Sequence, residues 1–152
     1  MDEFFMQEAL KEASKAYEIN EVPIGAVIVK NGEIVGRGHN QKETFKDATL
    51  HAEINAIKDA CKNLGGWRLP GCTMYVTLEP CSMCAGALVN SRIERLVIGT
   101  MDLKTGACGS VLNIVQMEKL NHQIDVDFGV LEGDCSNILK NFFAELRNSK
   151  KQ

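Results

Sequence analysis

The sequence contains no apolar run that approaches the roughly 18 residues of a membrane-spanning helix. Its acidic start, Met1-Asp2-Glu3-Phe4-Phe5, also lacks the basic residues and the small-residue cleavage site of a secretory signal. We therefore expect a cytoplasmic protein with no membrane partner.

The chain also has no excess of positive charge, because its 17 Lys and Arg residues are outnumbered by 20 Asp and Glu residues, for a net charge of −3. This balance argues against a general nucleic-acid coat, which is usually basic, but a local patch could still hold an RNA. Arg147, Lys150 and Lys151 concentrate positive charge at the C-terminus. A solvated tail from about residue 147 and a local attraction for phosphate are the two interpretations of this cluster.

Internal repeats, low-complexity stretches and Pro/Ser-rich linkers are absent as well. With 152 residues, the chain is long enough for one substantial core, so we predict a single domain over residues 1–152. In the reducing cytoplasm its six cysteines need not form disulfides, and a metal role for the closely spaced Cys81 and Cys84 is favoured.

Hydrophobic periodicity predicts alternating helices and strands after an opening hairpin. Asn31-Gly32, between two runs rich in β-branched residues, predicts the turn of that hairpin. The predicted helices cover about residues 5–17, 49–64, 80–89 and 134–147. The predicted strands cover about residues 24–30, 33–36, 73–78, 93–98 and 124–130. This order indicates an α/β fold with a mixed sheet between two helical layers.

One histidine and two cysteines have the spacing of a catalytic zinc site. His51-Ala52-Glu53 precedes Pro80-Cys81-Ser82-Met83-Cys84 in the chain. One imidazole and two thiolates supply three ligands of a tetrahedral zinc ion and leave the fourth position for water. Cys81 and Cys84 lie at the start of a predicted helix and project from the same face. Taken alone, the cysteine pair could be a redox dithiol or half of a structural site, but the combination favours catalysis.

Glu53 lies about 200° around an ideal helix from His51, which disfavours chelation of one ion by both residues. It is better placed as a proton carrier beside the zinc-bound water. We hypothesise that Glu53 takes a proton from this water and that the resulting hydroxide attacks an amidine-type ring carbon. Glu53 then returns protons to the ring nitrogen and to the departing amine.

The H-x-E and P-C-x-x-C motifs resemble the signature of the zinc-dependent nucleobase deaminases. Further segments are similar to the bacterial tRNA-specific adenosine deaminases. These segments are residues 21–27, 51–54, 78–87 and 102–110, together with the Phe142-Phe143 pair of the final helix. The similarity continues in order from about Glu8 to this pair.

This resemblance implies a three-layer α/β/α fold of the cytidine-deaminase type, with a mixed sheet of about five strands. It implies hydrolysis of the wobble adenosine, at position 34 of a tRNA anticodon loop, to inosine. It also implies a homodimer with one Zn²⁺ per chain, held by His51, Cys81 and Cys84, with Glu53 as the proton shuttle.

The resemblance further implies a set of substrate contacts. Asn40 corresponds to a base-contacting asparagine, Asp102 and Lys104 to the loop that meets the RNA, and Phe143 to an aromatic beside the flipped-out nucleotides. The full predicted set is Val22, Pro23, Ile24, Asn40, Ala52, Leu78, Glu79, Asp102, Lys104 and Phe143. The chain departs from the family pattern at His39, where tryptophan is common, at Ala48, often proline, and at Met101, which replaces a basic residue.

Two other functions remain open on these residues. A deaminase of free bases or nucleosides, such as guanine, cytosine or cytidine, would share the zinc chemistry but would not need the 102–110 loop to face outward. A zinc-stabilised binding module without turnover would need a fourth protein ligand and no carboxylate beside the metal. The Glu53→Ala variant distinguishes this module from an enzyme, because an enzyme would keep zinc and lose activity.

Overall fold

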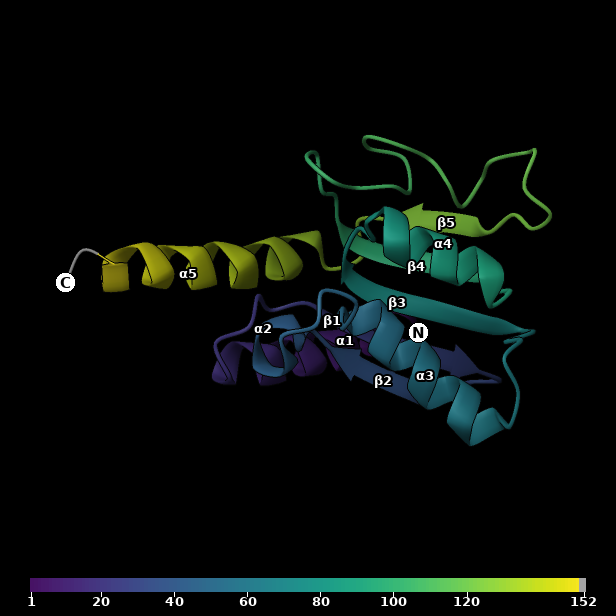
Figure 1. Cartoon of the computed structure of the whole chain (residues 1–152), viewed down its shortest axis with the longest axis horizontal. Helices are drawn as coiled ribbons and strands as arrows, with labels where there is room; N and C mark the ends of the chain where they lie inside the picture. Colours follow the sequence, from purple (N-terminus) through teal and green to yellow (C-terminus); the bar gives the residue numbers. More distant parts are fainter. Residues whose placement is uncertain (151–152) are drawn as a thin grey trace.

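A five-stranded mixed sheet forms the centre of the fold in the computed structural model, which describes residues 1–150 (Figure 1). The strands are β1 (Gly25–Lys30), β2 (Glu33–His39), β3 (Cys72–Leu78), β4 (Arg95–Thr100) and β5 (Asp125–Phe128). Their order is β2-β1-β3-β4-β5; β1 runs antiparallel to both of its neighbours, and β3, β4 and β5 are parallel. Asn31 and Gly32 both adopt positive φ, as a tight hairpin turn requires, which confirms the predicted hairpin.

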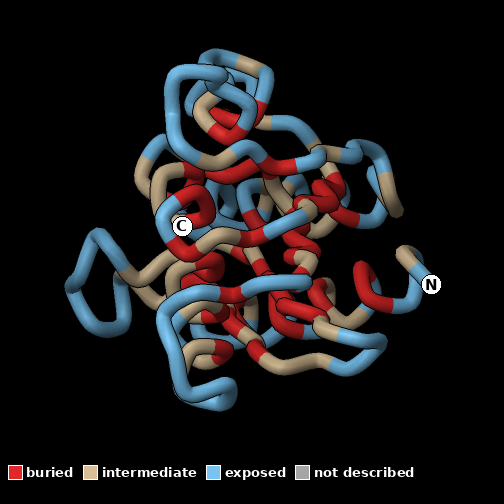
Figure 2. Tube along the Cα trace, turned by 90° about the vertical axis from the view of Figure 1, so that its right-hand side faces the viewer, coloured by how far each residue is buried: buried red, intermediate tan, exposed pale blue. Residues whose placement is uncertain are grey.

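Helices cover both faces of this sheet. Helices α3 (Ala52–Leu64) and α4 (Ser82–Asn90) lie in front of it in Figure 1, and α1 (Asp2–Glu18) lies behind. Successive strand residues point to opposite faces. Ala26 and Ile28 accordingly join the core under α3 and α4, whereas Val27 joins the core under α1. The predicted three-layer α/β/α fold is confirmed, and Figure 2 shows the buried segments gathered inside a shell of exposed loops.

Several element boundaries differ from the prediction. Helix α3 begins at Ala52 rather than near Thr49, because His51 has an extended backbone, and residues 42–45 form an unpredicted short helix, α2 (Lys42–Phe45). Helix α5 (Glu132–Lys150) is longer at both ends than predicted. Arg147 therefore lies within a helix and not in a frayed tail; Lys151 lies outside the described residues.

Glycines in β2 allow α3 to approach the sheet closely. A Cβ atom on Gly38 would collide with the backbone of Ala52 and Ala56, and one on Gly36 would collide with Ala56 and Ala60. Strand β2 thus packs backbone to backbone against α3. This close approach fixes the start of α3, and with it His51, at the end of the sheet.

Replacing Gly38 by alanine should push the start of α3 away from the sheet. We expect a loss of about 1–3 kcal/mol of folding free energy, as for other overpacked cores, together with weaker zinc binding. Denaturant unfolding and zinc titration of Gly38→Ala would measure both effects. Gly66→Ala is the matched control, since nothing lies within 4 Å of a Cβ there. Equal stability and zinc affinity in the two variants would contradict this account.

Within residues 1–150, no helix combines the length and the apolar character needed to cross a bilayer.

Candidate metal centre and substrate pocket

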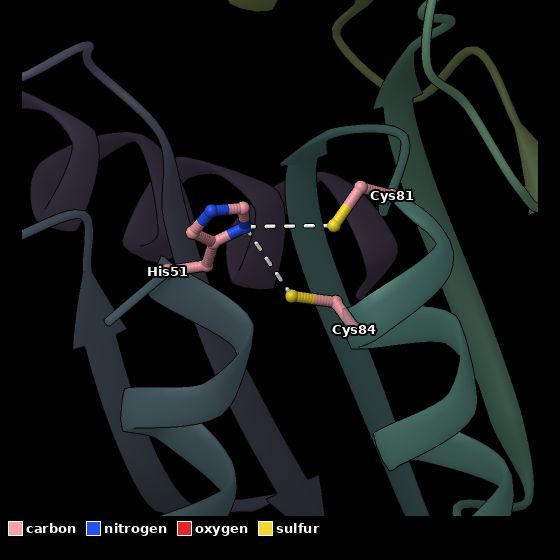
Figure 3. A group of neighbouring side chains, drawn as sticks. All are labelled: His51, Cys81 and Cys84. Carbon is pink, nitrogen blue, oxygen red and sulfur yellow. Dashed lines mark hydrogen bonds between the residues drawn. The ribbon is translucent and has the colours of Figure 1, made fainter. Parts of the chain in front are cut away.

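The three predicted metal ligands come together where two helices begin. His51 immediately precedes α3, Cys81 immediately precedes α4, and Cys84 lies in the first turn of α4. Figure 3 shows the imidazole and the two thiols pointing toward one another across the gap between these helices. Helix α4 directly follows β3, so the group lies at the carboxyl end of a parallel strand, where α/β proteins commonly bind ligands.

The spacing of the three ligand atoms fits one metal ion. His51 Nδ1 lies 3.6 Å from the Sγ atom of Cys81 and 3.6 Å from that of Cys84. All three atoms lie within 4.8 Å of one another. Tetrahedral zinc, with Zn–N near 2.1 Å and Zn–S near 2.3 Å, requires an N···S separation of about 3.6 Å. The donor set and its geometry therefore suit zinc.

The pKa values of the two thiols are shifted in opposite directions. Hydrogen bonds from Cys84 and His51 lower the pKa of Cys81 to about 3, against the opposing effect of burial. The hydrogen bond to Cys81 and burial both raise the pKa of Cys84. One thiolate is thus already favoured at neutral pH, and metal binding by both sulfurs would release the proton of the other.

Glu53 is buried beside the metal ligands without being one of them. Its side chain is 4% exposed, in the first turn of α3. It lines a small hollow of about 90 Å³ together with His51 and Cys81. Burial raises its pKa to about 7, which places its proton exchange near neutrality. A buried carboxylate outside the ligand set is the arrangement predicted for a proton carrier.

A larger pocket of about 510 Å³ opens next to this hollow. Its volume is in the range of small-molecule sites. The predicted substrate contacts that line it are Val22, Ile24, Asn40, Leu78, Asp102, Lys104 and Phe143. His51 also lines it, so the pocket leads to the metal ligands. The structure therefore brings these residues, distant in sequence, around one cavity.

Three other predicted substrate contacts do not line this larger pocket. Pro23 and Ala52 are buried and do not line the larger pocket. Glu79 is 2% exposed; it lines the small hollow beside Glu53, and its carboxylate is hydrogen-bonded by the following loop. It accepts hydrogen bonds from the backbone amides of Asp102, Cys108 and Ser110, at 3.1, 3.0 and 3.0 Å. In the structure, Glu79 thus holds the 102–110 loop against the end of β3.

Asn40 is positioned by its own side-chain amide. Its Nδ2 donates to the carbonyl of Val22 at 3.3 Å, and its Oδ1 accepts from the amide of Lys42 at 3.3 Å. One N–H and one lone pair of the amide remain available for a base edge. The side chain is therefore held rigidly while keeping both kinds of hydrogen-bonding capacity.

The sequence analysis did not identify every residue of the pocket. Lys42, Leu103, Thr105 and Leu139 also line it. Leu139 could have been found, because it precedes Phe143 by one helical turn and so shares its face. Lys42 had no such signal, since α2 was not predicted.

Comparisons with known proteins agree with the geometry of the site. A family model of MafB19-like deaminases matches residues 1–147. A tRNA-specific adenosine deaminase of Bacillus subtilis (strain 168) is 56% identical over 150 residues, which cover 99% of this chain and 93% of the relative. The chain belongs to the tRNA-specific adenosine deaminases. The Aquifex aeolicus (strain VF5) member of this family is 49% identical, over 97% of each chain.

Solved structures of a tRNA:A34 deaminase study and of a guanine deaminase both match the fold of this chain. A structure from a study of A-to-I editing by tRNA:A34 deaminases matches with a TM-score of 0.86 and 46% identity, over 90% of this chain and 99% of that one. A guanine deaminase from Nitrosomonas europaea matches with a TM-score of 0.81 but only 22% identity, over 93% of this chain and 84% of that one. The latter likeness shows the fold alone.

Proposed function

We propose that this chain hydrolyses the wobble adenosine of a tRNA anticodon loop, at position 34, to inosine and ammonia. One observation carries the proposal: a His-Cys-Cys metal group and the buried Glu53 lie at the base of a pocket lined by Asn40 and Phe143. The relatives at 49–56% identity are tRNA-specific adenosine deaminases, which supports this substrate over a free base.

Residues His51, Cys81 and Cys84 would hold one zinc ion, with no other ligand from the chain required. When bound, zinc supplies a Lewis acid that lowers the pKa of water to about 7. Glu53 accepts a proton from the attacking water. It delivers this proton to the ring nitrogen next to the attacked carbon. Glu53 then moves the second proton, from the hydroxyl group left on that carbon, to the departing amine. The water's oxygen becomes the keto oxygen of inosine, so the balance of the reaction is adenosine plus water to inosine plus ammonia.

Pocket residues orient the base for this attack. Asn40 offers one donor and one acceptor to the purine edge, and Val22, Ile24 and Leu78 form apolar walls around the ring. Phe143, 40% exposed at the rim, is free to stack on a neighbouring base. Unpaired loop nucleotides suit such a pocket because their bases leave the stack at low cost.

The proposal extends to assembly and location. We infer that the chain works as a single catalytic domain in a homodimer. The loop that connects β4 to β5 exposes four apolar side chains that a partner would cover, at Val111, Leu112, Met117 and Leu120. We place the protein in the cytoplasm, in keeping with six free cysteine thiols.

The test is incubation of the zinc-loaded protein with an anticodon stem-loop RNA that carries adenosine at the wobble position. Inosine at that position alone, detected by sequencing, is the expected result. Parallel reactions contain free guanine, cytosine, cytidine and adenosine. Ammonia from one of these compounds, with no inosine in the stem-loop, would overturn the proposal in favour of a free-base or nucleoside deaminase.

A further inference from the structure

Three hydrogen bonds join side chains of α3 to the backbone of β2, which lies at one edge of the sheet in the described chain (Figure 1). They run from Asn55 to the His39 carbonyl, from the Arg37 amide to Asp59, and from Asn63 to the Val35 carbonyl, at 2.9, 2.9 and 2.8 Å. Four helical residues rise about 6.0 Å and two strand residues about 6.6 Å, so every fourth residue of α3 can meet every second residue of β2. We call these bonds the α3–β2 ladder.

The bond at Asn55 differs from the rest of the α3–β2 ladder because the same amide group makes a second contact. Asn55 Nδ2 also donates to the side-chain oxygen of Gln41 at 3.2 Å. Both N–H groups of this amide are therefore used. Their acceptors, His39 and Gln41, are the two residues on either side of Asn40. A single side chain thus holds the segment that presents Asn40 to the substrate pocket.

Asn55 connects this segment to the helix of the metal site. Its backbone amide donates to the carbonyl of His51 at 3.1 Å, in the first turn of α3. Asn40 itself bonds to the pocket wall and to α2, and its backbone amide donates to the carbonyl of Ile24 at 3.2 Å. These partners of Asn40 do not belong to α3. The placement of Asn40 relative to Glu53 therefore depends on Asn55, together with the close packing of β2 on α3.

We propose that Asn55 is a positioning residue for deamination, which holds Asn40 and the base edge that Asn40 contacts in line with Glu53 and the metal ligands. This inference rests on the proposed function and adds to it a residue that lines neither the substrate pocket nor the small hollow. Catalytic rates depend strongly on such placement, because a displacement of about 1 Å can cost about a hundredfold. Supporting hydrogen bonds keep such displacements small.

The first experiment compares two substitutions in the α3–β2 ladder. Asn55→Leu keeps the approximate size of the side chain but removes both donors. We expect the variant to retain its zinc and to lose on the order of tenfold in kcat/KM for the stem-loop RNA. Asn63→Leu is the matched control, since it removes the same kind of bond from the same helix, at the end away from the metal ligands. Its kcat/KM should stay within about twofold of the unaltered protein.

A double-mutant cycle with Asn40→Ala tests whether Asn55 acts through Asn40. If it does, Asn55→Leu should change kcat/KM by less than about twofold in the Asn40→Ala background, because the side chain that it positions is gone. A merely structural role predicts the same loss in both backgrounds. Single-turnover rates give the cycle for slow variants. Affinity for the stem-loop RNA, measured on the same four proteins, gives a second cycle that requires no turnover.

The outcomes separate this inference from the proposed function. If the unaltered protein forms no inosine, the proposed function fails. If it forms inosine but Asn55→Leu acts equally with and without Asn40, the positioning role alone is overturned. An equal loss of kcat/KM in Asn63→Leu would overturn it as well, because the effect would then belong to the whole α3–β2 ladder.

Discussion

Glu53→Gln should retain about one zinc per chain and lose deamination by roughly two to four orders of magnitude, the usual contribution of a general acid–base group. The reason is structural. Glu53 supplies none of the three ligand atoms. The other two carboxylates that line the same hollow, those of Glu79 and Asp102, accept hydrogen bonds from the 102–110 loop. Glutamine keeps the size of the side chain but cannot carry a proton.

Metal analysis and inosine quantification on the same protein sample would check this prediction. Cys84→Ala is the informative contrast, since it removes a ligand and should lower zinc content as well as activity. A Glu53→Gln protein that loses its zinc and unfolds would instead favour a zinc-stabilised module without turnover. Full activity in Glu53→Gln would remove Glu53 from the mechanism.

Glu79→Ala should destabilise the fold by about 3 kcal/mol, because the buried amide of Cys108, the partly buried amides of Asp102 and Ser110, and the Ser110 hydroxyl would lose their acceptor at once. For a chain of this length, that corresponds to a fall in Tm of about 6–12 °C. The 102–110 loop should also lose protection from hydrogen exchange. Since Asp102 and Lys104 belong to that loop, KM for the stem-loop RNA should rise.

Calorimetry and hydrogen exchange would measure these effects. Glu94→Ala is the matched control, because the Glu94 carboxylate is exposed and accepts a hydrogen bond from the single amide of Gly71. We expect that variant to lose less than about 1 kcal/mol. An equal Tm for the two variants would show that Glu79 does not hold the loop.

Local patterns were enough to predict the fold class and the metal group. The Asn31-Gly32 turn and the alternating apolar residues of the strands follow from short-range preferences, so the hairpin and the three layers could be predicted. The spacing of Cys81 and Cys84, and the helical offset of Glu53 from His51, likewise depend on a single helix each.

Features that depend on tertiary packing escaped prediction. The loop contacts of Glu79 could not be foreseen, because the amides that bind its carboxylate lie up to 31 residues away along the chain. Helix α2 has only four residues, too few for a periodic pattern, so Lys42 was missed.

Different parts of the site come from the two faces of the sheet. The candidate metal ligands and Glu53 lie at or just before the first turns of α3 and α4. The outer wall of the pocket, at Leu139 and Phe143, comes instead from α5, which packs with α1 on the opposite face. The pocket joins the two layers at the carboxyl ends of β3 and β4. Substitutions along α5 can therefore reshape one wall of the pocket and leave the candidate metal ligands in place, so the shape of the pocket and the reaction centre can change independently.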